Sequence, residues 1–571
     1  MKRLALPLIL VCLSGITSAQ LLPDQKLVDF QNLAALYAKQ YAPYAWKRDV
    51  LNYDMLKLAP WLDKVRATKD DLGFYEVGAA YVASLNDAHS EFFVDSDFQA
   101  YLGFDVDLYD GKALIDNIDP SIARTVTFQT GDELVSVDGK SVADWLVEIG
   151  KYSSYANARS TSRYNALLIT DRVQSIYPRA VEIGDTATVV IRRKSSGNLQ
   201  TYTMPWATTG TPFITNGPVP SPVVTSAPGV GVRSKRPVGV GTGPTPPRSK
   251  YLMTLRNNRL PAAKDLRGFD AVTPVFQPSF PSSFVRRLGR STDFFYSGTF
   301  TASGKKIGYI RIPDFQDPQS GLEQFALSQF DSEMIFMKSN TDGLVVDVMR
   351  NPGGDGCYAE ALLQDIIPFR FRGIGNQIRV TQDMLLGLSQ EIDQADVFGF
   401  DQLTVDQLNF ILSEMQAAYK QNRGLTDPLP QCGTYFERDP ATDSKGNSIA
   451  YTKPVLLLTD EFSTSAAELF SAIFQDSQRG PIFGWRTAGA GGSVGGAQLS
   501  GFYSESASTV TLSLLVRTQH VLTPDFPVTD YIENVGVRPD ITLDYMTEDN
   551  LTNRGKAFVA GFTQAMLDLL Q

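Results

Sequence analysis

The sequence is poor in the residues that bind metal ions and form disulfides. Its 571 residues include 3 cysteines and 2 histidines, His89 and His520. Cys12 lies in the N-terminal apolar stretch, so Cys357 and Cys432 are left for the rest of the chain. Without a cysteine–histidine cluster a zinc site is excluded, and no metal or other cofactor is expected. The two remaining cysteines could form one disulfide or stay as buried thiols.

Long apolar runs and an excess of basic residues are also absent. Beyond the N-terminus no segment approaches the ~18 uninterrupted apolar residues of a membrane-spanning helix, so stable membrane insertion is not expected. The chain has 52 Lys and Arg against 62 Asp and Glu, a net charge of −10. A nucleic-acid-binding protein would need a basic surface, so that class is excluded. The composition is that of an ordinary globular protein with several domains.

The N-terminus is typical of an export signal. Lys2 and Arg3 precede an apolar stretch over residues 4–13, and small residues lead to a cleavage site after Ala19. A buried first helix is the alternative. We therefore predict that residues 1–19 are a signal peptide and that the mature protein is secreted or extracytoplasmic.

Local patterns change along the first half of the mature chain. Residues 20–100 carry apolar side chains at helical spacing and include a polar turn with His89. Residues 101–206 consist of short alternating segments broken by Asp–Gly turns, which predicts a small β domain. Residues 207–290 are rich in proline and glycine, most densely over 218–250. This composition predicts a linker, or an inhibitory segment that is removed during activation.

Two motifs of the β domain are similar to those of PDZ domains. They are LGF over residues 102–104 and GDELVSVDG over residues 131–139. The resemblance implies that Leu102, Gly103 and Phe104 present backbone N–H groups to a peptide C-terminus, which adds a strand to the sheet. An unrelated small β domain is the alternative.

The second half of the chain alternates buried strands with helices. Residues 301–548 include apolar strand patterns at 307–312, 343–348 and 455–458, with helices after the last two, and residues 549–571 form a C-terminal helix. This alternation predicts an α/β core with a βα-repeating sheet, whose active residues would lie at the C-terminal ends of its strands.

A serine lies where the third of these strands gives way to a helix. Ser465 begins that helix, where backbone N–H groups can stabilise a developing oxyanion. A serine at a helix start is usually only an N-cap. However, glycine-rich turns follow two neighbouring strands, at 350–356 and 484–492, and such turns expose N–H groups. Together these features favour a nucleophile over a simple cap.

The order of these motifs resembles the tail-specific, or C-terminal processing, serine peptidases. The motifs are RNPGG over 350–354, STSAAE over 463–468 and GWRTAG over 484–489, and LNDAH over 85–89 matches the family's Leu-x-Asp-x-His box. The resemblance covers residues 301–545. It implies a crotonase-like sheet and, aligned on the motif's glutamate, places the nucleophile at Ser465 and not at Ser463.

The general base differs from that of many family members. They use a lysine in the turn that follows the nucleophile, but residues 486–492 contain none and Ala490 stands near its place. Arg486 cannot substitute, because a guanidinium does not lose its proton near neutral pH. His89, which lies in the matching box, is therefore the expected base.

Two further runs resemble one branch of the family, that of the chlamydial protease-like activity factor. They are RTAGAGG over 486–492 and YIENVGVRP over 531–539. The branch has a Ser-His-Glu triad, a PDZ-like domain and a cleavable inhibitory segment. The resemblance therefore implies a triad of Ser465, His89 and Glu533, in which the carboxylate orients the imidazole. A surface acid is the alternative for Glu533.

The same resemblance implies the oxyanion donors and the function. The donors are the N–H of Gly353 or Gly354 and that of Ala466. The expected function is a secreted serine endopeptidase acting on polypeptide substrates. The alternatives are a catalytically silent, PDZ-like peptide-binding scaffold and a non-proteolytic hydrolase, although the Gly-x-Ser-x-Gly elbow of the latter is absent. A homodimer is possible, but the sequence gives no signal for it.

Overall fold

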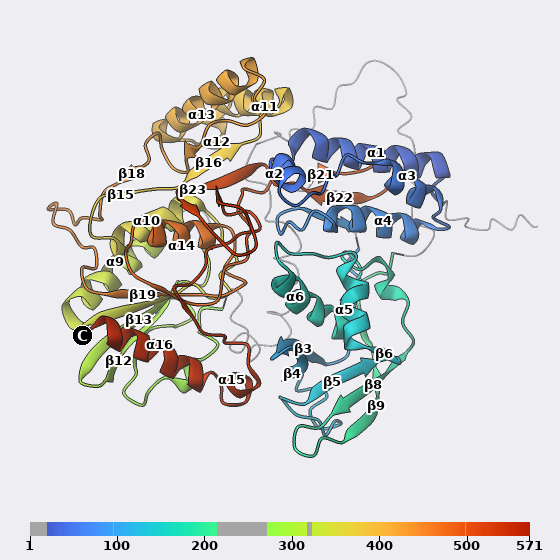
Figure 1. Ribbon diagram of the computed structural model, residues 1–571, viewed down its shortest axis with the longest axis horizontal. Coiled ribbons are helices and arrows are strands. Elements are labelled where there is room, and N and C mark those ends of the chain that lie inside the picture. Colours follow the sequence, from blue (N-terminus) through green and yellow to red (C-terminus); the bar gives the residue numbers. More distant parts are fainter. Residues whose placement is uncertain (1–19, 95, 214–270, 317–322, 497) are drawn as a thin grey trace, which may run out of the picture.

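The chain forms three parts, shown in Figure 1: an N-terminal helical segment, a β domain and an α/β core. This computed structural model describes residues 20–94, 96–213, 271–316, 323–496 and 498–571. The predicted signal peptide and the Pro/Gly-rich residues 218–250 lie outside these ranges. Within them, no helix combines the length and apolar character needed to cross a membrane.

The core is built on a seven-stranded sheet. In spatial order its strands are β11 (Val285–Leu288), β12 (Tyr296–Ala302), β13 (Lys305–Arg311), β14 (Gly343–Asp347), β19 (Val455–Thr459), β20 (Ile482–Gly484) and β25 (Ile541–Thr542). Strands β13 to β25 run parallel, whereas β11 and β12 are antiparallel. Parallel strands are buried on both faces, which explains the continuous apolar runs of β14 and β19.

Helices cover both faces of this sheet (Figure 1). On one face lie α9 (Glu323–Asn340), α10 (Gly356–Ile366) and α14 (Ala466–Asp476); on the other lies α16 (Lys556–Leu569), which follows α15 (Glu548–Thr552). Val346 of β14 packs in the core on the side of α9, α10 and α14, whereas Val345 packs in the core on the side of α16. Successive side chains of a strand point to opposite faces, so each strand feeds both layers.

The core also carries smaller elements beside the main sheet. The helices are α11 (Gln382–Asp393), α12 (Ala395–Phe398) and α13 (Gln402–Lys420). The strands are β17 (Leu429–Pro430), β16 (Gly375–Ile378), β23 (Ser513–Val521) and β24 (Thr529–Tyr531) in one sheet, and β15 (Phe371–Arg372) with β18 (Glu437–Arg438).

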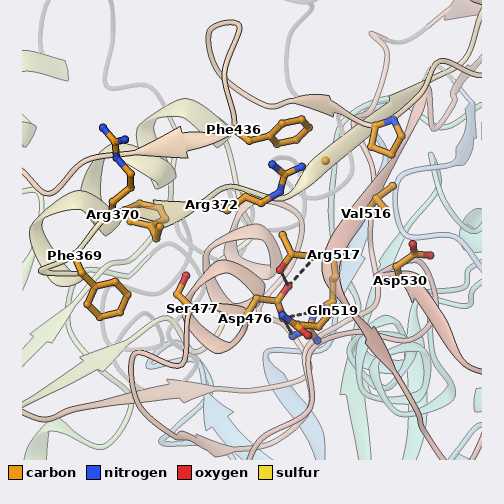
Figure 2. A pocket seen from close by; sticks show the side chains of 14 residues that line it. Phe369, Arg370, Arg372, Phe436, Asp476, Ser477, Val516, Arg517, Gln519 and Asp530 are labelled. Atoms are coloured by element: carbon orange, nitrogen blue, oxygen red, sulfur yellow. Dashed lines mark hydrogen bonds and ion pairs between the residues drawn. The ribbon is translucent and has the colours of Figure 1, made fainter.

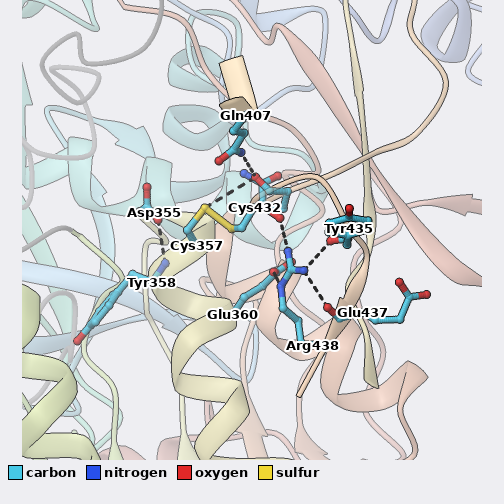
Figure 3. The surroundings of a disulfide bond; sticks show 10 residues. Asp355, Cys357, Tyr358, Glu360, Gln407, Cys432, Tyr435, Glu437 and Arg438 are labelled. Carbon is cyan, nitrogen blue, oxygen red and sulfur yellow. Dashed lines mark hydrogen bonds and ion pairs between the residues drawn. A yellow bond between two sulfur atoms is a disulfide. The ribbon is translucent and has the colours of Figure 1, made fainter. Parts of the chain in front are cut away.

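The two cysteines that the sequence left open form a disulfide (Figure 3). Cys357 and Cys432 are 75 residues apart, with their Cα atoms 5.4 Å from each other. Arg438 donates a hydrogen bond to the carbonyl of Cys432 and another, at 2.7 Å, to Glu360. The bridge therefore fastens the first turn of α10 to the segment that follows α13.

The predicted β domain is a separate sheet with its own core. Its strands are β3 (Phe104–Tyr109), β4 (Lys112–Ile118), β5 (Glu133–Val137), β8 (Thr186–Arg192) and β9 (Leu199–Pro205), with β6 (Lys140–Ser141) beside β5. The helices α5 (Val142–Gly150) and α6 (Ala158–Thr170) and the short η1 (Pro178–Val181) complete it. The core cluster of this domain includes Phe462, which belongs to the loop after β19. The β domain is thus packed against the α/β core.

The N-terminal segment is helical, as predicted, but it is joined to the C-terminal half by β-pairing. Its helices are α1 (Pro23–Gln40), α2 (Tyr44–Asp49), α3 (Ala59–Arg66) and α4 (Asp71–Ala83). After them β1 (Glu91–Val94) pairs antiparallel with β22 (Ser506–Thr509), which also pairs with β21 (Gln498–Leu499). The N-terminal segment and the C-terminal half of the chain therefore share one sheet.

The expectation that residues 207–290 form a linker is wrong at both ends of this range. β10 (Ala207–Thr209) pairs with β2 (Gln99–Tyr101), which also pairs with β7 (Asp171–Val173). At the other end, η2 (Gln277–Ser279) and β11 belong to the core, because phenylalanines pack there against β12, β13 and α16. These phenylalanines are Phe276, Phe280 and Phe284. The packing of a few aromatic side chains thus places this segment in the core, although its composition is poor in apolar residues.

Candidate active site

Ser465 occupies a strained turn between a strand and a helix. It is the N-cap of α14, with φ 57° and ψ −117°, and its side chain is partly exposed. Such a backbone conformation costs free energy in a non-glycine residue and is concentrated at functional sites. Ser463, by contrast, is fully buried and its hydroxyl donates to the carbonyl of Val348 at 2.8 Å. The hydroxyl of Ser463 is therefore used in a buried hydrogen bond, whereas Ser465 remains partly exposed.

The first glycine-rich turn lies directly against Ser465. A Cβ on Gly353, whose φ is 93°, would lie 2.6 Å from the Cβ of Ser465. The N–H of Gly353 donates to Asn351 Oδ1 at 2.8 Å and is thereby used. Among the described residues, the N–H groups of Gly354 and Ala466 find no acceptor. Of the two glycines that sequence reasoning could not separate, Gly354 is thus the one with a free donor.

Glu468 holds the serine turn to the second glycine-rich turn. Its buried carboxylate accepts from Thr487 Oγ1, Gly489 N and Ala490 N, each at 2.6 Å, and from Ser465 N at 3.3 Å. Burial raises the pKa of Glu468 to about 7, and these hydrogen bonds oppose the rise. The glutamate of the sequence motif therefore supports the backbone of Ser465.

His89 lies in a polar turn after α4, as predicted, and Asp87 shapes that turn. The N–H of His89 donates to Asp87 Oδ1 at 2.8 Å, while Thr511 Oγ1 donates to Asp87 Oδ2 at 2.7 Å. Burial lowers the pKa of His89 below its usual 6.5, and the charge of Asp87 opposes this. The imidazole is therefore neutral at pH 7 and able to accept a proton. Its Nδ1 is buried and has no hydrogen-bond partner among the described residues.

Glu533 is fully buried, so the reading of this residue as a surface acid is wrong. Its Oε1 lies 2.6 Å from the ammonium of Lys47, and its Oε2 accepts from Gly491 N at 3.2 Å. Burial and the charge of Asp87 raise the pKa of Glu533 to about 8, whereas Lys47 and the Gly491 N–H lower it. Sequence reasoning missed Lys47, which is 486 residues away along the chain, and no local pattern marks it.

The structure brings the predicted residues into one region without joining them directly. The loop over 489–491 contacts the carboxylate of Glu468, which also accepts from Ser465 N, and the carboxylate of Glu533. Asn534 Nδ2 donates at 2.8 Å to the carbonyl of Asn86, in the turn that carries His89. Within the described ranges, however, no hydrogen bond connects His89 with Ser465 or Glu533.

One of the three residues predicted to bind a peptide already has a partner within the protein. Leu102 and Phe104 are buried, and the N–H of Leu102 donates to the carbonyl of Thr170 in α6 at 2.9 Å. Arg163 of the same helix forms ion pairs with Asp107 of β3 at 2.7 Å and with Glu461 at 2.8 Å. The N–H of Leu102 is therefore not free to receive a peptide C-terminus while α6 holds this position.

A cavity of about 580 Å³ lies at the opposite end of α14 from Ser465 (Figure 2). Its walls combine aromatic and charged side chains, among them Phe369, Arg372, Phe436, Asp476 and Arg517. Arg517 and Asp476 are buried and form an ion pair. None of the predicted catalytic residues lines this cavity. In the part of the chain that the structure describes, no cluster of side chains could hold a metal ion.

Comparisons with known proteins agree with this architecture. Residues 306–543 match the model of peptidase family S41, and residues 98–212 match that of the PDZ domain. Proteins of Chlamydia muridarum and Chlamydia trachomatis serovar D are each 24% identical to the chain, over 593 and 590 residues, which is 94% of this chain and 91% of each relative.

Solved structures show the same fold over nearly the whole chain. The structure is similar to mature CPAF, with a TM-score of 0.70 and 22% identity over 96% of this chain and 98% of that one. It is also similar to mature CPAF complexed with lactacystin, with a TM-score of 0.70 and 21% identity over 96% and 99%. The resemblance to the tail-specific peptidases, and to the chlamydial branch among them, is confirmed. The chain is a serine peptidase that carries a peptidase family S41 domain over residues 306–543 and a PDZ domain over residues 98–212.

Proposed function

We propose that the chain is a secreted serine endopeptidase that hydrolyses polypeptides with a triad of Ser465, His89 and Glu533. The observation that carries the proposal is the backbone of Ser465, which has a positive φ at the start of α14 and lies against Gly353. A strained strand-to-helix turn presents a nucleophile in other hydrolases, where helix N–H groups face the developing charge.

The reaction follows from the roles of these groups. Ser465 Oγ attacks the peptide carbonyl carbon while His89 Nε2 takes the hydroxyl proton. The N–H groups of Ala466 and Gly354 bind the oxyanion of the tetrahedral intermediate. The intermediate collapses to an acyl-enzyme, and His89 gives its proton to the departing amine. His89 then deprotonates a water molecule, which attacks the ester and restores Ser465 as the acid product leaves.

The triad requires His89 Nδ1–H to donate to Glu533 during this cycle. Two observations support that role: the Nδ1 atom is buried without a partner among the described residues, and Glu533 is a buried carboxylate fixed by Lys47 and Gly491. Catalytic hydrogen bonds are often loose in the absence of substrate and tighten when it binds. We infer that substrate binding brings the imidazole onto Glu533.

Export and activation are part of the proposal. Support for export comes from the charged and apolar start of the sequence, and from the Cys357–Cys432 disulfide, because such bridges persist in oxidising compartments. Activation by self-cleavage within residues 207–290 rests on the composition of that segment and on the branch the sequence resembles; two of the similar solved structures are of mature CPAF. A passive linker is the alternative.

A serine-reactive probe tests the proposal. The purified protein is incubated with a fluorescent fluorophosphonate and, separately, with an unfolded polypeptide whose fragments are mapped by mass spectrometry. We expect labelling of the wild type and cuts inside the polypeptide chain, and neither with Ser465→Ala. If the wild type is neither labelled nor active, the catalytically silent peptide-binding scaffold replaces this proposal.

A further inference from the structure

Lys47 is a buried ammonium with all of its donors in use. It lies on α2, and 1% of its side chain is exposed. Its Nζ donates to Glu533 Oε1 at 2.6 Å, to Asn534 Oδ1 at 2.6 Å and to the carbonyl of Asn86 at 3.0 Å. A lysine ammonium has three N–H donors, so this set of acceptors satisfies it completely.

Burying a lysine ammonium at this position costs free energy, so its presence there calls for a functional reason. Taking an ammonium and a carboxylate out of water costs several kcal/mol for each ion, and apolar residues of similar size often pack as well. The groups that face Glu533 are Lys47 on α2, Asp87 in the turn after α4, and the hydroxyl of Tyr41 after α1. Of these three, Lys47 alone is cationic, so it offsets the repulsion between two buried carboxylates.

The contacts of Lys47 also fix the geometry between two members of the triad. The carbonyl of Asn86, three residues before His89, accepts from both Lys47 Nζ and Asn534 Nδ2. Asn534 directly follows Glu533, and its Oδ1 also accepts from Trp46 Nε1 at 3.1 Å. A single cluster of hydrogen bonds therefore connects α2, the turn of His89 and the segment of Glu533.

We propose that Lys47 is a positioning residue of the peptidase reaction, which favours the ionised form of Glu533 and holds this side chain in register with the turn that carries His89. The inference rests on the proposed triad and deepens it. Lys47 touches neither substrate nor the reacting atoms, so it acts through Glu533.

If Lys47 acts through Glu533, the activity lost on removing its charge should depend on pH in one direction. Glu533 must be ionised to stabilise the imidazolium of His89, and its pKa near 8 already includes the favourable charge of Lys47. Removing that charge raises the pKa of Glu533 further. At neutral pH the fraction of ionised Glu533 then falls about tenfold for each unit of the rise. Raising the pH restores the carboxylate, so the loss of activity shrinks as the solution becomes more alkaline.

The test compares kcat/KM from pH 6 to pH 10 for the full-length wild type, K47M, E533Q and the double variant. Methionine matches the length of lysine but carries no charge. K39M is the control, because Lys39 pairs with Asp383 at 3.4 Å on the exposed surface and its loss changes the net charge equally. A fluorogenic peptide is the substrate, and circular dichroism verifies the fold of each variant.

We expect K47M to lose at least about tenfold in kcat/KM at pH 7 and to recover most of it by pH 10. E533Q should show a loss that does not recover, the double variant should equal E533Q, and K39M should match the wild type. A K47M loss that is constant with pH, or additive with E533Q, would overturn the proposal. E533Q with wild-type activity would instead refute the triad itself.

A second variant covers the case in which K47M does not fold. K47R retains the charge and should keep the pH midpoint of the wild type, even if the larger guanidinium lowers kcat. A K47R profile displaced to alkaline pH would show that charge at this position does not govern Glu533.

Discussion

At the scale of single residues, the two serines of the STSAAE motif have different tasks. Ser465→Ala should abolish proteolysis and fluorophosphonate labelling while the protein remains folded. Ser463→Ala should remain active, but it loses the buried hydrogen bond to Val348, which costs about 1 kcal/mol of the free energy of unfolding. Activity assays combined with urea denaturation distinguish the two outcomes. Inactive, stable Ser463→Ala together with active Ser465→Ala would reverse the assignment of the nucleophile.

The histidine base should appear both in mutants and in the pH profile. His89→Ala should reduce kcat by about 10⁴-fold or more, and the double variant with Ser465→Ala should be no worse, because members of a triad act as one unit. On acidification kcat/KM should fall as Glu533 becomes protonated, around pH 8, and again as His89 becomes protonated, below pH 6.5. In Glu533→Gln only the lower step should remain. A flat wild-type profile from pH 5 to 8 would contradict a histidine base.

At the scale of elements, the first glycine-rich turn packs so closely against Ser465 that Gly353 has no room for a side chain. Gly353→Ala would place a Cβ 2.6 Å from both the Cβ of Ser465 and the carbonyl oxygen of Thr464. We expect the displaced oxyanion turn to cost about 100-fold or more in kcat. Gly446→Ala is the control: its φ is also positive, at 81°, but a Cβ there meets nothing within 4 Å. It should lose about 1 kcal/mol of stability and no activity.

The disulfide stabilises the helix that begins just after this turn. Cys357 lies in the first turn of α10, and the bridge closes a loop with a sequence separation of 75 residues. In the chain-entropy model such a loop contributes about 4 kcal/mol to the free energy of unfolding. The double variant with serine at both positions should therefore unfold at clearly lower guanidinium concentration. An unchanged midpoint in both redox states would show that the bridge does not form in the protein.

The sequence predicted elements well where a run of apolar residues was unbroken. The strands expected at 343–348 and 455–458 agree with β14 and β19 to within a residue, because both are buried apolar runs bounded by turns. It failed where sparse long-range contacts decide the structure. The phenylalanines near residue 280 draw β11 into the core sheet, although proline and glycine surround them. The position of Lys47 beside Glu533 could not be inferred, because only the folded chain brings α2 to that carboxylate.

At the scale of the whole molecule, the proposed active site is assembled from distant parts of the chain. His89 and Lys47 come from the N-terminal segment, whereas Ser465 and Glu533 come from the α/β core. The two parts are joined by the pairing of β1 with β22 and by the buried Lys47–Glu533 pair. The two residues that flank residues 214–270 are held by hydrogen bonds. Phe213 N donates to Gln174 Oε1 at 2.6 Å, and the carbonyl of Ala271 accepts from Arg311 Nε at 2.8 Å.

This arrangement predicts the fate of a chain cut between residues 218 and 250. Both ends of the interval are anchored, so the two fragments should stay associated and elute as one species in gel filtration, and separate only in denaturant. The wild type should cut itself here, with a lag in activity, while Ser465→Ala stays whole. Deletion of residues 218–250 should remove the lag.

The activity of the separated fragments gives the strictest test of a site shared between them. Each lacks part of the proposed triad, so each should be inactive alone, and activity should return only when the two are refolded together. Fragments that elute apart under native conditions and yet remain active would contradict a site shared between them. An uncut wild type with full activity from the first time point would instead leave the interval as a passive linker, because a covering segment must delay the reaction until it is removed.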